Sequence, residues 1–422
     1  MIEIQRVERI DAVVTIPGSK SITQRALITA ALADGVSTLH GPLVSEDTDY
    51  SSAALEQMGI GIDKDGRKWR VSGTGGRISA PGDDIYLGNN GTATRFLTSV
   101  ACLGTGEFII DGDERMRQRP IGPLMTALQG WGVDIESIDA TGCPPLSILA
   151  SGLRGGGTVL PEGKSSQYLS SLLLVAPYAR QQAELQVVGE ILSKPYVTMT
   201  LQVMAAFGVE VSAAADLSRF SIPGGCYLPC DYHIEGDASN ASYFWAAAAI
   251  TGGSVTVDNV PVPSLQGDAM LVPLLARMGC CVEQRGRGIR VMGPRSLDPI
   301  TVDMGDMPDV VPTLAVVAAF AEGASEISNI AHLRIKECDR LSATTAELRK
   351  LGVEVEEFDD RMVVHGRGGT GMRGAEIETY EDHRMAMSMA VAGLRIEGVR
   401  ILDERCVAKS FPDFWERFAG LY

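Results

Sequence analysis

The sequence predicts an α/β (α+β) protein with two similar domains, each built from three copies of a βαβαββ unit. The main observation is a helix end, a glycine and a β alternation that recur together along the chain. The residue numbers of these glycines differ by 73, 76, 71 and 73. A period near 70 is too long for a simple solenoid, so we expect compact units packed three and three. The glycines are Gly59, Gly132, Gly208, Gly279 and Gly352.

Each of these glycines follows a leucine-containing helical segment and precedes an alternating segment. This order is typical of a left-handed residue just after a helix, followed by a strand. A weaker sixth copy ends at Gly420.

A second pattern recurs six times in step with the first: an apolar strand, a polar loop and an alanine-rich buried helix. In the first copy, residues 12–16 form the strand and residues 17–25 carry the loop into the helix, which Gly35 stops. Ser19 or Ser21 can cap this helix. The other loops are residues 88–95, 163–167, 236–240, 304–309 and 380–384.

The first loop places Lys20 and Arg25 in the first turns of a helix, where the helix dipole disfavours cations. Free backbone N–H groups at the same place favour an anion. We therefore interpret this loop as an anion site. A break near residues 230–236 divides the six copies evenly between two domains.

The bulk composition excludes several classes of function. The chain has 422 residues, of which 45% are hydrophobic, and it contains no apolar run long enough for a membrane span. Its first residues lack a signal-peptide pattern, so we expect a cytoplasmic protein, or one that has lost a transit peptide. The net charge of −16 argues against nucleic acid and anionic membranes as partners.

The residues favour neither a structural zinc site nor a nicotinamide or ATP site. Of the eight cysteines, Cys226 and Cys230 resemble half a zinc site, and His233 follows, but a fourth ligand is missing. The Gly-Lys-Ser at residues 163–165 is not a phosphate-binding P-loop, because Thr158 stands where that motif needs glycine.

Basic residues gather at the six loops and beside them. In an acidic protein, helix openings that converge on one interdomain cleft would focus small polyanions, for which arginine is well suited. Acids among cations stay ionised, which suits Asp309 and Glu337 for proton transfer. Asp309 could equally be a helix cap, and His383 a packing residue. The basic residues are Lys20, Arg25, Arg95, Arg115, Arg117, Arg119, Lys164, Lys194, Lys336, Arg340, Arg384 and Lys409.

Several motifs together resemble the 5-enolpyruvylshikimate-3-phosphate synthases (3-phosphoshikimate 1-carboxyvinyltransferases) of the enolpyruvyl transferase family. The resemblance covers essentially the whole chain. The motifs occupy residues 17–21, 88–95, 119–122, 165–167, 193–196, 307–309, 336–340, 382–387 and 409–413.

The resemblance implies the inverted-barrel fold of that family, with the active site in the interdomain cleft. The first strand would then join the second half of the chain. One domain would comprise residues 1–18 and 235–422, with repeats four to six, and the other residues 19–234, with repeats one to three.

The implied reaction transfers the enolpyruvyl group of phosphoenolpyruvate to the 5-hydroxyl of shikimate 3-phosphate and releases phosphate, in chorismate and aromatic amino acid biosynthesis. It proceeds by addition and elimination, and the resemblance implies that it needs no metal or organic cofactor. The residues implied to hold shikimate 3-phosphate are Lys20, Ser21, Arg25, Ser165, Ser166, Gln167, Ser193, Asp309, His332 and Lys336. Those implied to hold phosphoenolpyruvate are Lys20, Asn89, Gly91, Arg119, Gln167, Arg340, Arg384 and Lys409.

The implied catalytic groups are Asp309 as the base, Glu337 as proton donor to carbon, and Lys20 and Lys409 as charge stabilisers, with His383 beside them. The sequence departs from the family pattern at Gln24 and at His332, where asparagine is common. Gly91 leaves room for the inhibitor glyphosate, so we expect a glyphosate-sensitive enzyme.

Two alternatives remain at this stage. The sister enzyme that acts on UDP-N-acetylglucosamine carries a reactive cysteine before its Arg-Pro, and residues 115–120 contain none. A non-catalytic anion-binding protein would not need Asp309, Glu337 and Lys409 together. The resemblance implies a monomer that binds small-molecule substrates.

Overall fold

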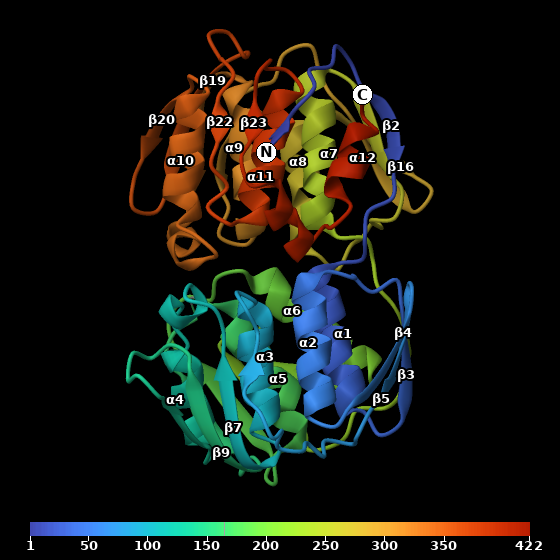
Figure 1. The fold of residues 1–422 in the computed structure, drawn as a ribbon, viewed down its shortest axis with the longest axis vertical. Coiled ribbons are helices and arrows are strands. Elements are labelled where there is room, and N and C mark those ends of the chain that lie inside the picture. Colours follow the sequence, from blue (N-terminus) through green and yellow to red (C-terminus); the bar gives the residue numbers. More distant parts are fainter. Residues whose placement is uncertain (164) are drawn as a thin grey trace. The chain divides into compact units, whose positions relative to one another are not determined.

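The computed structural model describes residues 1–163 and 165–422. Lys164, which belongs to the third polar loop, lies outside the described residues. The chain divides into two compact units (Figure 1). The N-terminal unit is Gly18–Ile234, and the C-terminal unit joins Met1–Pro17 to Glu235–Tyr422.

Each unit contains three repeats of one topology. A first strand, an inner helix and a parallel second strand are followed by an outer helix and an antiparallel pair of strands. In the last repeat of the C-terminal unit, a single antiparallel strand takes the place of that pair. In the N-terminal unit, the second repeat comprises β6 (Ile85–Tyr86), α3 (Gly91–Ala101), β7 (Thr105–Asp111), α4 (Gly122–Gly130), β8 (Asp134–Ser137) and β9 (Leu146–Ser151). The third comprises β10 (Gly156–Leu160), α5 (Ser166–Val175), β11 (Ala183–Val187), α6 (Lys194–Ala206), β12 (Ser212–Ala213) and β13 (Arg219–Ile222).

The first repeat takes its first strand from the far end of its unit. β14 (Asp231–His233) pairs in parallel with β3 (Val36–His40). The segment that precedes the first loop forms β2 (Asp11–Val14), which pairs with β15 (Ser254–Val257) of the C-terminal unit. The remaining elements of the first repeat are α1 (Lys20–Leu32), α2 (Glu46–Gln57), β4 (Gly61–Asp65) and β5 (Lys68–Ser72).

The C-terminal unit repeats this plan. Its first repeat is β2, α7 (Ala238–Thr251), β15 (Ser254–Val257), α8 (Leu271–Arg277), β16 (Cys281–Arg285) and β17 (Gly288–Met292). The next is β18 (Thr301–Asp303), α9 (Val311–Ala319), β19 (Glu322–Ser328), α10 (Arg340–Lys350), β20 (Glu354–Glu357) and β21 (Met362–Arg367). The last is β22 (Glu376–Ile377), α11 (His383–Gly393), β23 (Arg400–Ile401), α12 (Phe414–Ala419) and β1 (Ile2–Glu3), which lies antiparallel to β23.

The predicted repeat is therefore present, and the sheets among the described residues are small and open rather than closed barrels. The five helix-end glycines all have φ between +86° and +99°, which confirms their prediction as left-handed residues after helices. Gly420, in the weaker sixth copy, has φ −69° instead.

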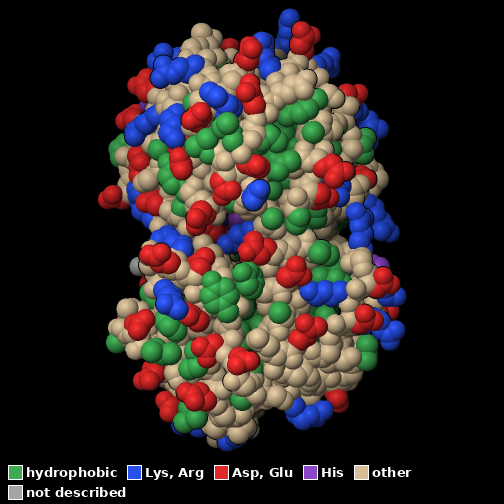
Figure 2. Space-filling model, in the orientation of Figure 1, with side chains coloured by type: hydrophobic (Ala, Val, Ile, Leu, Met, Phe, Trp, Pro, Cys, Tyr) green, Lys and Arg blue, Asp and Glu red, His purple; other side chains and the backbone are tan. Residues whose placement is uncertain are grey.

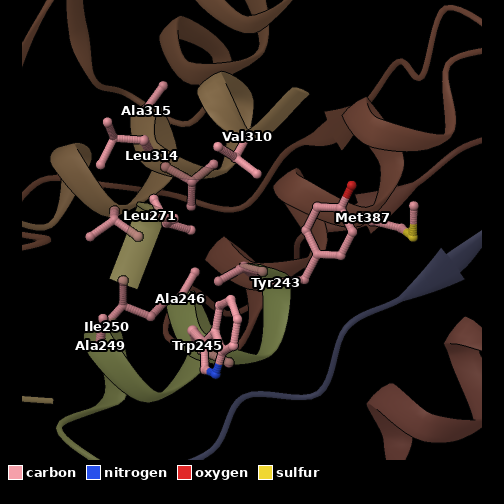
Figure 3. Close-up of a cluster of buried hydrophobic side chains, with 14 of the residues drawn as sticks. Tyr243, Trp245, Ala246, Ala249, Ile250, Leu271, Val310, Leu314, Ala315 and Met387 are labelled. Carbon is pink, nitrogen blue, oxygen red and sulfur yellow. The ribbon is translucent and has the colours of Figure 1, made fainter. Parts of the chain in front are cut away.

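The inner helices form the core of each unit. α7, α9 and α11 are buried throughout, so they carry alanine and large apolar residues on all sides. Figure 3 shows Tyr243 and Trp245 of α7 in the same apolar cluster as Leu314 of α9 and Met387 of α11. Burying each large side chain contributes about 1.5–3 kcal/mol.

The surface is charged and mixed. Acidic and basic side chains are interspersed on the face of each unit that Figure 2 shows. No helix among the described residues is long and apolar enough to cross a membrane.

Candidate active site

The inner helices of the N-terminal unit begin at the predicted polar loops. Ser19, rather than Ser21, caps α1, since its hydroxyl accepts the N–H of Ile22. Asn90 caps α3 by accepting the N–H of Ala93, and Ser165 precedes α5. The candidates Lys20, Ser21, Gly91, Ser166 and Gln167 therefore all lie in first helical turns of this unit.

Lys20 is tied to the neighbouring helices by a buried ion pair. Its Nζ lies 3.0 Å from Oδ2 of Asp47, in the first turn of α2. The amide of Asn90 donates to the carbonyl of Asp47 at 2.6 Å and accepts from Gln24 at 3.4 Å. This network links α1, α2 and α3 at the end where they begin.

Arg25 is a buried cation whose hydrogen bonds, within the described residues, all go to neutral groups. It donates to the hydroxyls of Thr200 at 2.7 Å and Ser170 at 3.2 Å, and to the carbonyls of Ser21 and Tyr196. Burial lowers its pKa to about 10. A cation that costs this much to bury is well placed to receive an anion.

Arg119 and Gly91 lie against each other. Nη1 of Arg119 donates to Oδ1 of Asn89 at 2.9 Å, and the side chain is 4% exposed. A Cβ on Gly91 would lie 2.7 Å from Cζ of Arg119. The guanidinium therefore takes this position because residue 91 has no side chain.

Two further candidates contribute polar groups in the same unit. The amide of Gln167 donates to Oγ1 of Thr92 at 3.0 Å. Ser193, just before α6, has the left-handed backbone φ of +57°, which is costly for a residue with a side chain. Strain of this kind is concentrated at functional sites.

Arg340 is the centre of the charged cluster in the C-terminal unit. Its guanidinium is buried and lies 2.9 Å from Asp309, 2.7 Å from Glu337 and 2.7 Å from Asp382. Burial alone would lower the pKa of Arg340, but the three carboxylates raise it well above its ordinary value.

Asp309 lies between two arginines. Its second oxygen is 2.6 Å from Nη2 of Arg384. Burial by itself would raise the pKa of Asp309, but Arg384, Arg340 and Lys336 together hold it well below its usual range. The N-cap of α9 is Val310, so Asp309 serves the ion cluster and not the helix cap.

The remaining candidates of this unit surround the same helix starts. His383 is fully buried in the first turn of α11, with Nδ1 3.7 Å from Asp382. Lys409 is buried at the end of a 3₁₀ turn. Neither ring nitrogen of the buried His332 has a hydrogen-bond partner in the described part of the chain. Burial, then the charge of Lys336, lowers the pKa of His332 to about 3, so its ring is neutral.

The sequence alone did not identify several groups that shape this site. Asp382 stands directly before His383 in the motif at residues 382–387, but the sequence did not indicate that it pairs with Arg340. Asp47 and Asp268 had no such signal. Asp268 is buried, accepts a hydrogen bond from the Ser239 hydroxyl, and has its pKa raised to about 7 by burial and by Asp309.

The described residues contain no group of three or more His, Cys, Asp or Glu side chains that could hold a metal ion. What the two units offer is different. The N-terminal unit presents buried cations at helix openings, and the C-terminal unit presents an ionised carboxylate held by arginines. The first suits anion binding and the second suits proton transfer next to bound charge.

Comparison with known proteins bears on this chemistry. A family model described as EPSP synthase (3-phosphoshikimate 1-carboxyvinyltransferase) matches residues 4–418. The 3-phosphoshikimate 1-carboxyvinyltransferase of Nostoc punctiforme is 45% identical over 421 residues, covering 99% of this chain and 98% of that protein. The chloroplastic enzyme of Arabidopsis thaliana is 42% identical, with coverage of 98% and 83%. The solved EPSP synthase of Acinetobacter baumannii, 28% identical, has a TM-score of 0.83 and coverage of 99% and 97%. The chain therefore belongs to the EPSP synthase family.

Proposed function

We propose that this protein is a transferase that moves the enolpyruvyl group of phosphoenolpyruvate to the 5-hydroxyl of shikimate 3-phosphate, yielding 5-enolpyruvylshikimate 3-phosphate and phosphate. Its family supports the reaction, and the buried, neutrally partnered Arg25 is the observation that carries the binding of a phosphorylated acceptor.

Shikimate 3-phosphate would be held mainly from the N-terminal unit. The phosphate would give Arg25 an anionic partner, which its present neutral partners do not supply. Backbone N–H groups at the helix N-termini would donate to the same anion. Hydroxyl and amide groups around it would bind the remaining oxygens. The proposed residues are Lys20, Ser21, Arg25, Ser165, Ser166, Gln167 and Ser193, with Asp309, His332 and Lys336 from the C-terminal unit.

Phosphoenolpyruvate carries a phosphate and a carboxylate, and both suit guanidinium groups. Arg119 offers one guanidinium beside Gly91, and Arg340 and Arg384 offer two in the C-terminal unit. The full proposed set is Lys20, Asn89, Gly91, Arg119, Gln167, Arg340, Arg384 and Lys409.

Asp309 would act as the base. Without substrate, Arg340 and Arg384 hold its pKa low, which makes it a weak proton acceptor. When anionic substrate groups bind these arginines, part of their charge is offset, and the proton affinity of Asp309 rises. The arginines therefore couple donor binding to the basicity of Asp309.

The reaction then balances as an addition followed by an elimination. Asp309 takes the 5-hydroxyl proton as that oxygen bonds to carbon 2 of phosphoenolpyruvate. Glu337, which must enter this step in its protonated form, gives that proton to carbon 3. The tetrahedral intermediate loses phosphate from carbon 2 and a proton from carbon 3, and the same groups reverse their roles. Lys20 and Lys409 stabilise the changing charge, with His383 in the proposed catalytic set.

Phosphate release tests this function against both alternatives. Purified protein is mixed with phosphoenolpyruvate alone, with shikimate 3-phosphate added, or with UDP-N-acetylglucosamine added. We expect release only with shikimate 3-phosphate. Release with the nucleotide sugar would identify the sister activity, and no release in any mixture would leave only an anion-binding role.

We also propose that glyphosate inhibits the enzyme by competing with phosphoenolpyruvate beside Gly91. We also propose that the protein is cytoplasmic and that it acts as a monomer, because the groups assigned from both units belong to one chain. Kinetics that are unchanged by millimolar glyphosate would contradict the first statement, and activity confined to an oligomer would contradict the second.

A further inference from the structure

A cavity of about 470 Å³ lies in the C-terminal unit, away from the candidate active site. Its walls include the C-terminal ends of all three inner helices: Thr251 at the end of α7 and Gly252 after it, Phe320 after α9, and Arg395 after α11. The candidate catalytic groups lie at the opposite, N-terminal ends. The 14 residues of α7 alone span about 21 Å between the two ends.

Three arginines from separate segments line this cavity. Arg9 precedes β2, Arg295 follows β17, and Arg395 follows α11; all three are exposed. None of them forms an ion pair with a carboxylate of the described residues. Glu322 is the one acid in the lining. A cluster of net positive charge is unusual on a chain whose net charge is −16.

The N-terminal unit shows which interactions the fold requires at the position equivalent to Arg395. Arg395 donates from Nη1 to the carbonyl of Ile250 at 3.3 Å, and Tyr178 donates from its hydroxyl to the carbonyl of Leu32. The two bonds are equivalent, because each of the four residues is 13 positions after the N-cap of its inner helix. In the C-terminal unit, Arg395 is counted from Asp382 and Ile250 from Asp237. In the N-terminal unit, Tyr178 is counted from Ser165 and Leu32 from Ser19.

The rest of this position differs between the units. In the N-terminal unit the tyrosine ring packs so closely on Gly76 that a Cβ there would overlap the ring. Gly73 packs against the carbonyl of Ala30 in the N-terminal unit, and Gly293 packs against that of Ala248 in the C-terminal unit, so these two glycines correspond. Gly76 and Ser296 each lie three residues further along the chain. Ser296 therefore corresponds to Gly76, and it lines the open cavity.

A hydrogen bond to the carbonyl at the end of the first inner helix therefore requires neither a cation nor a cavity, because the neutral hydroxyl of Tyr178 makes the equivalent bond in the N-terminal unit. We propose that the arginine-lined cavity is a second binding site, for a small organic polyanion that carries phosphate or carboxylate groups. Its volume is in the range of small-molecule sites, and guanidinium groups bind both anions in bidentate fashion.

Calorimetric titration with inorganic pyrophosphate and with citrate, at constant ionic strength, tests the proposal on the full-length protein. The variant Arg295→Gln/Arg395→Tyr removes two charges and introduces the tyrosine of the other unit. Arg277→Gln is the matched control, because Arg277 is an exposed arginine that also donates to a backbone carbonyl, that of Thr301.

We expect the double variant to lose one binding component of the wild type, or to weaken it at least tenfold, while Arg277→Gln keeps it. The two probes distinguish phosphate from carboxylate preference. Binding at the active site is common to all three proteins and cancels in the comparison. Identical titrations for wild type and double variant would overturn the proposal, as would an equal loss in the control.

A second double variant controls for the possibility that the first one misfolds. Arg9→Gln/Arg295→Gln alters two side chains for which the structure shows no hydrogen bond within the described residues. It should weaken the same component with an unchanged thermal midpoint and unchanged transferase turnover in probe-free buffer. Retained binding in this pair would show that the two arginines are not ligands and would refute the site as proposed.

Discussion

Arg25 and Arg340 are both buried arginines, yet their surroundings give them opposite roles. Arg25 donates hydrogen bonds to hydroxyls and carbonyls, so its positive charge is not offset by the described residues and can bind an anion. Arg340 meets three carboxylates, so its charge is already offset. The residue type therefore does not decide function here; the charge of the partners does.

Substitution of Gly91 tests whether Arg119 binds phosphoenolpyruvate and glyphosate. Gly91→Ala should fold, because the overlapping neighbour is the flexible end of Arg119, but it should displace that guanidinium. Loss of one charge-assisted hydrogen bond costs about 1.5–3 kcal/mol, or roughly 10–100-fold in binding. We expect a higher KM for phosphoenolpyruvate and weaker glyphosate inhibition in steady-state kinetics.

Gly122→Ala is the matched control, since Gly122 also begins a helix and its nearest neighbour to a new Cβ is 4.0 Å away. It should leave both constants unchanged. If Gly91→Ala binds donor and inhibitor as the wild type does, Arg119 does not contact them.

Asp268 predicts a dependence of stability on pH. Its pKa is about 7 in the folded protein and near 3.8 when exposed, so the fold favours the protonated form. The free energy of unfolding therefore falls as pH rises from about 4 to 7, by an amount on the order of a few kcal/mol. Asp268→Asn cannot ionise and should escape this loss.

Urea unfolding at pH 5 and pH 8 measures the effect. Relative to wild type, Asp268→Asn should gain stability at pH 8, while the exposed Asp298→Asn should show no such change. A stability difference that is the same at both pH values would rule out ionisation of Asp268 as its cause.

Sequence reasoning reached some residues and not others for physical reasons. Lys20 and Arg25 were predicted because cations in the first turns of a helix oppose the helix dipole, which is a local signal. The partner Asp47 and the buried Asp268 depend on packing between helices, and that packing leaves no mark in the nearby sequence.

At the level of elements, the recurring pattern predicted most of the fold. The glycines after α2, α4, α6, α8 and α10 were recognisable because a left-handed residue favours glycine. The short strands β14 and β1 were not recognisable. They have three and two residues, and their pairing with β3 and β23 is set by tertiary contact rather than by alternation.

The inner helices of the C-terminal unit carry a polar contact inside an apolar core. The hydroxyl of Thr313 on α9 lies 3.1 Å from that of Ser242 on α7 and 3.2 Å from that of Ser388 on α11. Thr313→Val keeps the volume but leaves buried hydroxyls short of a partner, so it should lower stability by about 1–3 kcal/mol.

Chemical denaturation of Thr313→Val and of Thr126→Val makes the comparison. Thr126 is an exposed threonine on α4 whose hydroxyl bonds to the carbonyl of Gly122, so its loss should cost much less. Equal losses in the two variants would mean that the hydroxyl cluster does not stabilise the packing of these helices.

The whole molecule uses one repeated architecture for two kinds of chemistry. The chain passes between the units at Pro17–Gly18 and again at Ile234–Glu235. The N-terminal unit supplies buried cations, and the C-terminal unit supplies an ionised carboxylate among arginines. The proposed transfer needs both, because an anionic acceptor must be held while its hydroxyl is deprotonated.

The most direct test of this account compares Asp309→Asn with wild type in shikimate 3-phosphate binding and in phosphate release. The substitution keeps the shape of the side chain and removes the base. We predict that acceptor binding changes little while turnover falls by about 10²–10⁴-fold. Turnover close to that of the wild type would contradict the assignment of Asp309 and, with it, the proposed division of roles between the two units.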